Sequence, residues 1–245
     1  MEYEEVWLVG SLDQNGNNMK DKHLKLLQRY DFEKPNFNKF KKGNIEVKHD
    51  KETGAWSIYK NKKELRTVDR FFVKCFSYMA MTDLAFGTTI ISGFGLGDIP
   101  NWLRHKPQVR EVTVIESSFD IIDYHEKYNN DLWGGVNMIQ NETIRFGTKC
   151  DVLLLDHYYD REPFEMEVVD FLDLIKKDIE LIEHKFLWFW PLEMLLTYET
   201  LQGKDLMDTY DKIKQKLPTL PYLKTQDLHY YMGMSHFNYI PLKKK

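Results

Sequence analysis

Cysteine is scarce in this chain of 245 residues, which contains only Cys75 and Cys150. Two cysteines cannot form a disulfide framework, and these two show no ligand spacing. His229 and His236 also lack cysteines or acids at the spacing of a metal site. We therefore expect reduced core cysteines and no bound metal.

Long hydrophobic runs are absent as well. The richest stretch, residues 186–192, is far shorter than the roughly 20 apolar residues that a membrane helix needs. The acidic start of the chain, residues 1–5, has no apolar segment of the kind found in signal peptides. The expectation is a cytoplasmic protein with no membrane partner.

The chain has little charge of one sign, with a formal net charge of −4, and so no general affinity for nucleic acid is expected. One local exception is the segment from Lys34 to Lys63, which contains nine lysines and only three acidic residues. A solvated hairpin surface explains this surplus most simply, and a site for DNA or RNA is the alternative. A small-molecule substrate is favoured, and the sequence indicates no oligomeric state.

What the chain does contain is enough apolar material for a core, since 42% of its residues are hydrophobic. Residues 1–85 predict a small subdomain of β-hairpins and helices, with apolar residues alternating in strand-like stretches. The strands expected there are residues 6–9, 44–49, 55–59 and 64–68, and the helices are residues 21–30 and 70–84.

Residues 86–245 show a different pattern, in which short β-branched apolar runs alternate with helical stretches. Such alternation predicts an α/β domain with a mostly parallel, doubly wound, Rossmann-like sheet covered by helices on both faces. The expected strands are residues 88–91, 112–115, 136–139, 151–156 and 186–190. The expected helices are residues 98–105, 118–128, 165–183 and 197–216, followed by a closing hairpin of residues 229–232 and 236–240.

Three strand ends carry the residues of chemical interest. Gly93, Gly95 and Gly97 follow the first parallel strand and lead into a helix, where glycine permits positive φ and a close approach to a ligand. Glu116 closes the second strand and can accept the hydroxyls of a ribose, while Asp156 closes the fourth. Ligands of such sheets bind at the carboxyl ends of the strands, so the pattern predicts a nucleotide site.

The glycine spacing favours S-adenosylmethionine over a dinucleotide. A dinucleotide fingerprint requires a third glycine where this chain has Asp98, which we expect to cap the following helix. A carboxylate there would repel a pyrophosphate, whereas S-adenosylmethionine has no phosphate and carries a sulfonium and an amino group. The expected cofactor is therefore S-adenosylmethionine.

The segments at residues 90–97, 112–122 and 150–156 resemble the class I S-adenosylmethionine-dependent methyltransferases, and most of all their spermidine-synthase-like branch. The hairpins before the glycine loop are similar to the small β-domain of spermidine synthases. The resemblance implies that the loop, with Phe94, lies along the methionine portion of the cofactor. It also implies that Glu116 holds the ribose hydroxyls, that Ser117 lies next to the adenine, and that Asn141 stands where the family has an acid that contacts the adenine amine.

The chain departs from the synthases after the fourth strand. Residues 156–160 read Asp-His-Tyr-Tyr-Asp in place of an acidic segment with Ser or Thr, and the Gly-Gly-Gly-Asp-Gly loop is absent. Methyl transfer is therefore favoured over aminopropyl transfer. Another reaction of the same cofactor, or a binding protein without turnover, remains an alternative.

The catalytic candidates follow that strand end. Asp156 is the first candidate to accept a proton or hold a substrate amine, and His157 is the second because its ordinary pKa suits proton transfer near neutrality. Tyr158 and Tyr159 are expected to line the substrate site. The alternative for all four is a polar loop that caps the next helix.

Overall fold

The computed structural model describes residues 37–68, 83–140, 148–156 and 168–236 of the chain. The strand expected at residues 6–9, the helix at 21–30 and nearly all of the helix at 70–84 lie outside the described residues. The domain boundary near residue 85 stays a prediction. Within the described ranges, no helix is both long enough and apolar enough to cross a membrane.

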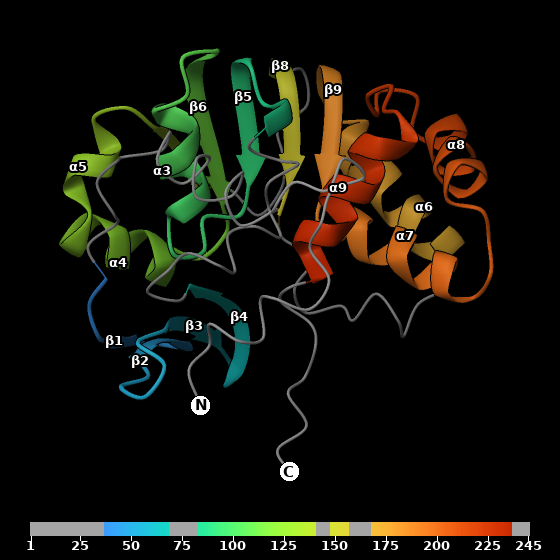
Figure 1. The fold of residues 1–245 in the computed structure, drawn as a ribbon. Coiled ribbons are helices and arrows are strands. Elements are labelled where there is room, and N and C mark those ends of the chain that lie inside the picture. Colours follow the sequence, from blue (N-terminus) through green and yellow to red (C-terminus); the bar gives the residue numbers. More distant parts are fainter. Residues whose placement is uncertain (1–36, 69–82, 141–147, 157–167, 237–245) are drawn as a thin grey trace. The chain divides into compact units, whose positions relative to one another are not determined.

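The small sheet is antiparallel and has four strands in the order β1-β2-β3-β4 (Figure 1). They are β1 (Phe40–Lys42), β2 (Ile45–His49), β3 (Trp56–Lys60) and β4 (Lys63–Val68). Ile45, Val47 and Ile58 turn to one buried face, as their alternation with polar residues predicts. The three predicted hairpin strands are confirmed, and β1 is an additional strand that the sequence pattern did not indicate.

The larger sheet has five parallel strands in the order β7-β6-β5-β8-β9, so the first strand of the α/β unit, β5, lies at its centre. These strands are β5 (Gly87–Ser92), β6 (Val109–Glu116), β7 (Asn137–Gln140), β8 (Thr148–Leu155) and β9 (Ile182–Phe189). All five predicted strands are confirmed, and the architecture is Rossmann-like. After β5 the chain adds strands first on one side (β6, β7) and then on the other (β8, β9), and such sheets bind ligands at the point where the strand order reverses.

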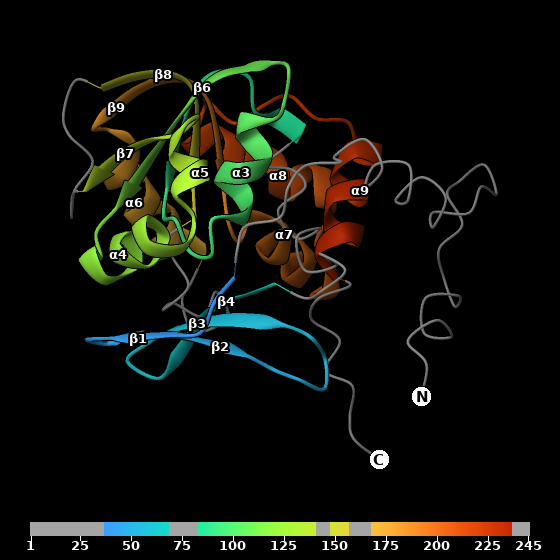
Figure 2. The ribbon, with the colours of Figure 1, turned by 90° about the vertical axis from the view of Figure 1, so that its left-hand side faces the viewer.

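Seven helices accompany this sheet within the described residues. They are α3 (Asp98–Arg104), α4 (Phe119–Tyr128), α5 (Asn130–Trp133), α6 (Val168–Ile179), α7 (Leu192–Leu201), α8 (Leu206–Lys216) and α9 (Thr225–His236). Right-handed crossovers place helices on both faces of a doubly wound sheet, and Figures 1 and 2 show α3 and α6 on opposite faces. Ser118 caps α4 by accepting a hydrogen bond from the Ile121 amide, as predicted.

Two predictions for the C-terminal part are wrong. The single helix expected at residues 197–216 is divided into α7 and α8, because Gly203 adopts φ of +82° beyond the end of α7. The closing hairpin is replaced by α9 up to residue 236. Leu228 and Met232 are buried four residues apart, which is the period of a helix face.

Candidate functional site

The glycine loop after β5 has the backbone that the sequence predicts. Gly93, Gly95 and Gly97 have φ values of +97°, +50° and +79°, a region that other residues adopt only with strain. The Gly93 amide donates to the Ile115 carbonyl of the neighbouring strand at 2.8 Å. The start of the loop is therefore tied to β6 by a backbone hydrogen bond.

Asp98 does not cap α3. The cap position belongs to Gly97, which offers no side-chain hydrogen bond, and Asp98 is the first residue of the helix. The carboxylate of Asp98 turns instead to Arg66, which accounts for the incorrect prediction. Because this ion pair compensates the charge of Asp98, the expected repulsion of a pyrophosphate is smaller than the sequence suggests, and only the missing third glycine still argues against a dinucleotide.

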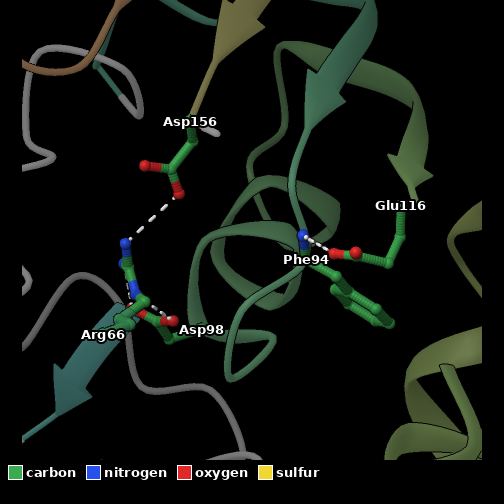
Figure 3. Close-up of polar contacts among 5 residues, drawn as sticks. All are labelled: Arg66, Phe94, Asp98, Glu116 and Asp156. Carbon is green, nitrogen blue, oxygen red and sulfur yellow. Dashed lines mark hydrogen bonds and ion pairs between the residues drawn. The ribbon is translucent and has the colours of Figure 1, made fainter. Parts of the chain in front are cut away.

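Glu116 ends β6 on one side of the loop (Figure 3). Its Oε2 accepts a hydrogen bond from the Phe94 amide at 2.9 Å, and its Oε1 accepts one from the Ser118 amide at 2.8 Å. Burial raises the pKa of Glu116, and these backbone amides oppose the rise. Each carboxylate oxygen has a second lone pair, so the side chain can still accept hydroxyl groups. Ser117 is exposed beside it.

Asp156 directly follows β8, on the opposite side of β5 from Glu116. It is only 2% exposed. Its Oδ2 accepts a hydrogen bond from Nη1 of Arg66 at 3.3 Å, whereas its buried Oδ1 has no hydrogen-bond partner among the described residues. Burial raises the pKa of Asp156 to about 8, with the Arg66 charge opposing the rise and the charges of Asp98 and Glu116 adding to it.

Arg66 is the site residue that the sequence does not reveal. It comes from β4 of the small sheet, is buried, and donates from Nε to Asp98 Oδ1 at 2.8 Å and from Nη2 to Asp98 Oδ2 (Figure 3). The signal was obscured because Arg66 belongs to a lysine-rich hairpin, where a cation is expected to face solvent. Arg66 pairs across the strands with the buried Ile58, next to a shift in strand register. Because paired residues of neighbouring strands lie on the same face of a sheet, Arg66 is on the buried face.

Glu193, a buried acid, is the second residue near the site that the sequence does not reveal. It stands in the first turn of α7 and accepts a hydrogen bond from Trp188 Nε1 at 3.1 Å. Burial raises the pKa of Glu193 to about 8, and the charge of Asp156 contributes to the rise. Among the described residues, four buried carboxyl groups thus stand at the carboxyl edge of the sheet with one guanidinium, that of Arg66.

Three predicted site residues, His157, Tyr158 and Asn141, lie outside the described residues, as does Tyr159. Their roles stay predictions. The glycine loop, Glu116 and Asp156 do end three adjacent strands at one edge of the sheet.

The lysine-rich hairpin is partly neutralised by nearby acids. Lys48 pairs with Glu46 at 2.8 Å, and Lys42 pairs with Asp123 of α4 at 3.2 Å. Such pairs are what a solvated hairpin surface would contain. They lower the positive charge available to a nucleic acid.

No protein-family profile matches the sequence, and a search among curated proteins finds no match. Among solved structures, the chain is similar to spermidine synthase from Thermotoga maritima, with 15% identity over 50% of this chain and 48% of that chain and a TM-score of 0.37. A spermidine synthase in complex with the transition state analogue AdoDATO gives 15% identity, 50% and 46% coverage and a TM-score of 0.36. A SAM-dependent methyltransferase from Aquifex aeolicus gives 15%, 46% and 61% coverage and a TM-score of 0.32.

The matched region spans about half the length of the spermidine synthases. At such TM-scores these similarities carry no argument about activity. The proposal that follows therefore rests on the residues at the strand ends.

Proposed function

We propose that this protein is an S-adenosylmethionine-dependent methyltransferase that acts on a small-molecule acceptor. The observation that carries the proposal is the arrangement around β5. Glu116 ends one neighbouring strand and is tied to the glycine loop through the Phe94 amide, while Asp156 ends the other neighbour with one carboxylate oxygen unpartnered among the described residues.

This arrangement suits an extended ligand with a nucleoside at one end. The ribose hydroxyls would meet Glu116, the adenine would lie near Ser117, and the remainder would cross the positive-φ glycines toward Asp156. Glycines let the ligand approach the backbone of the loop closely. Glu116, the glycine loop and Asp156 would thus meet the ribose, the middle and the far end of such a ligand in that order.

S-adenosylmethionine would supply a methyl group on a sulfonium. The protein has to align the acceptor and remove its proton, and alignment alone accounts for much of such catalysis. Asp156 suits the second task, because a pKa of about 8 makes its ionised form, a minor fraction at neutral pH that grows above it, a base able to take a proton at Oδ1. The acceptor's lone pair would bond to the methyl carbon, the carbon–sulfur bond would break toward sulfur, and the proton would pass to Asp156.

Calorimetry with S-adenosylmethionine and its demethylated product S-adenosylhomocysteine tests the cofactor assignment. Both are expected to bind, and absence of binding of either at millimolar concentration rejects the proposal. A screen of amine, hydroxyl and thiol acceptors with radiolabelled methyl donor then tests turnover. With a responsive acceptor, Asp156→Asn is expected to lower the rate by roughly 10²–10⁴-fold while cofactor binding persists.

Aminopropyl transfer is the second candidate. It is favoured by the four buried carboxyl groups of Asp98, Glu116, Asp156 and Glu193 against one guanidinium, since a cationic amine bound beside them would be stabilised by their ionised forms. A binding protein without turnover would show cofactor affinity but no product across the acceptor screen. The two transfer reactions use different forms of the donor, and this difference can be tested on the protein itself.

A further inference from the structure

On the β8 side of the site, a guanidinium and a carboxyl group are in contact. Arg66 and Asp156 have side chains that are 2% and 3% exposed, and they meet through Nη1 and Oδ2 at 3.3 Å. A buried guanidinium next to a ligand site is able to distinguish ligands by charge.

The contacts of Arg66 with Asp98 and with Asp156 are unequal. Its Nε donates to Asp98 Oδ1 at 2.8 Å and its Nη2 donates to Asp98 Oδ2, which together form a strong bidentate ion pair. Its contact with Asp156 is longer than the roughly 2.7–2.9 Å typical of charge-assisted hydrogen bonds. The guanidinium is therefore anchored by Asp98, and its Nη1 edge is the one that can exchange Asp156 for a ligand atom.

The position of this edge along the ligand follows from the sheet. If the ribose binds at Glu116 on the β6 side, the far end of S-adenosylmethionine would lie on the β8 side of β5, where Arg66 and Asp156 meet. That end is an α-amino acid and bears a carboxylate. Decarboxylated S-adenosylmethionine, the donor for aminopropyl transfer, has the same adenosine and sulfonium but lacks this carboxylate.

We propose that Arg66 is a specificity-determining residue, which binds the α-carboxylate of S-adenosylmethionine through Nη1 and so selects it over the decarboxylated form. This proposal rests on the proposed function and deepens it, because the choice of donor decides whether a methyl or an aminopropyl group is transferred. Planar guanidinium groups match carboxylates in shape and charge.

Neighbouring groups are compatible with a carboxylate at this position. Burial raises the pKa of Asp156 to about 8, so at neutral pH this side chain is mostly uncharged and does not repel the ligand. The charge of Asp98 is compensated by Arg66 itself. A small sheet that precedes the Rossmann-like unit thereby supplies one residue to the donor site.

Calorimetry with three ligands tests the assignment: S-adenosylmethionine, its decarboxylated form, and 5′-methylthioadenosine, which keeps the adenosine and a neutral thioether but has no amino-acid chain. The wild-type protein is expected to bind S-adenosylmethionine at least about tenfold more tightly than the decarboxylated form, as one hydrogen bond between charged groups implies. In Arg66→Met this ratio is expected to fall to about one. The affinity for 5′-methylthioadenosine should stay the same, which shows that the adenosine end is intact.

Arg110→Met is the matched control, because Arg110 stands near the amino end of β6, where its exposed guanidinium pairs with Asp151. It should leave the ratio unchanged. If Arg66→Met does not fold, Arg66→Lys is used instead, because lysine keeps the positive charge but cannot make the bidentate contact. It is expected to lower the ratio of the two affinities, to a smaller extent than Arg66→Met.

The wild-type comparison decides the matter without any variant. Equal or tighter binding of the decarboxylated form overturns the role of Arg66 and leaves the cofactor site standing. If none of the three ligands binds, the proposed function itself is rejected, and the role of Arg66 with it.

Discussion

His125 of α4 donates a hydrogen bond from Nε2 to the carbonyl oxygen of Gly95 at 2.9 Å. A carbonyl can only accept, so Nε2 carries the proton, and Nδ1 then accepts a hydrogen bond from Asn129 Nδ2 at 3.2 Å. Burial lowers the pKa of His125 to about 4, which keeps the ring neutral. Its ring also contacts that of Phe94, with 3.9 Å between the centroids. Helix α4 thus holds the glycine loop from the side facing β6.

Replacing this ring tests whether the loop must be held in place. His125→Phe keeps an aromatic ring against Phe94 but leaves the buried Gly95 carbonyl without its donor. We expect the free energy of unfolding to fall by about 1–3 kcal/mol, and the affinity for S-adenosylmethionine to fall as well because the loop is less ordered. Urea denaturation and calorimetry at pH 7 measure the two effects.

His184→Phe is the matched control. His184 stands near the amino end of β9, away from the glycine loop, and its ring nitrogens make contacts of 2.8 Å with the Ile182 carbonyl and with Thr219. This variant should lose stability and keep its cofactor affinity. Unchanged affinity in His125→Phe would contradict the positioning role.

Glu193→Gln should change how stability depends on pH. Burial raises the pKa of Glu193 from 4.5 to about 8, so between these values the folded protein keeps a proton that the unfolded chain has released. The contribution of this group to stability is greatest below pH 4.5 and declines as pH rises toward 8, by on the order of 5 kcal/mol. The Gln variant lacks this proton and should lose less stability over that range.

Urea denaturation of both proteins from pH 5 to pH 9 measures the difference. Asp156 is also buried with a raised pKa and contributes in the same direction in both proteins. The gap between variant and wild type should therefore grow in favour of Gln as pH rises. Parallel stability curves would mean that Glu193 is ionised in the folded protein.

The parts of the site that the sequence predicted are those with local signals. The β-branched run before Gly93, the glycines themselves and Ser118 before α4 all act on backbone within a few residues. A strand end followed by an acid is equally local, which is why Glu116 and Asp156 were found. The division of α7 from α8 also had local signals, namely Gly203 and the capping residue Asp205, whose carboxylate accepts from the Asp208 amide.

The contacts of Arg66 could not be predicted in this way. Arg66 is separated from Asp98 by 32 positions and from Asp156 by 90, and these pairs form only because one face of the small sheet presents Arg66 to the strand ends. A shift of strand register between Ile58 and Tyr59 helps to decide which face that is. Such a shift depends on packing between sheets rather than on the period of the sequence.

Gly95→Ala should act through Arg66. A Cβ atom at Gly95 would lie 3.0 Å from Cδ of Arg66, and the residue also has φ of +50°. We expect a loss of stability of about 1–2 kcal/mol from backbone strain, together with displacement of the guanidinium from Asp98 and Asp156. Calorimetry should then show a smaller preference for S-adenosylmethionine over its decarboxylated form.

Gly203→Ala separates strain from contact. Gly203 has φ of +82°, and a Cβ atom there would meet nothing within 4 Å. Gly203→Ala should lose stability through backbone strain, while the preference for S-adenosylmethionine over its decarboxylated form stays unchanged. If Gly95→Ala and Gly203→Ala behaved alike in both assays, the close approach of Arg66 to the loop would have no functional effect.

Glu116→Gln tests the ribose end of the site. The carboxylate of Glu116 accepts from the amides of Phe94 and Ser118 through different oxygens, whereas an amide side chain has one oxygen and would turn its own N–H groups toward the other donor. We expect S-adenosylmethionine and 5′-methylthioadenosine to lose affinity equally, by about tenfold or more, because both contain the ribose. Glu111→Gln on the same strand, where an exposed Glu111 accepts from Asn137 Nδ2, is the control and should bind both ligands normally. A loss confined to S-adenosylmethionine would place Glu116 at the amino-acid end and reverse the direction assigned to the ligand.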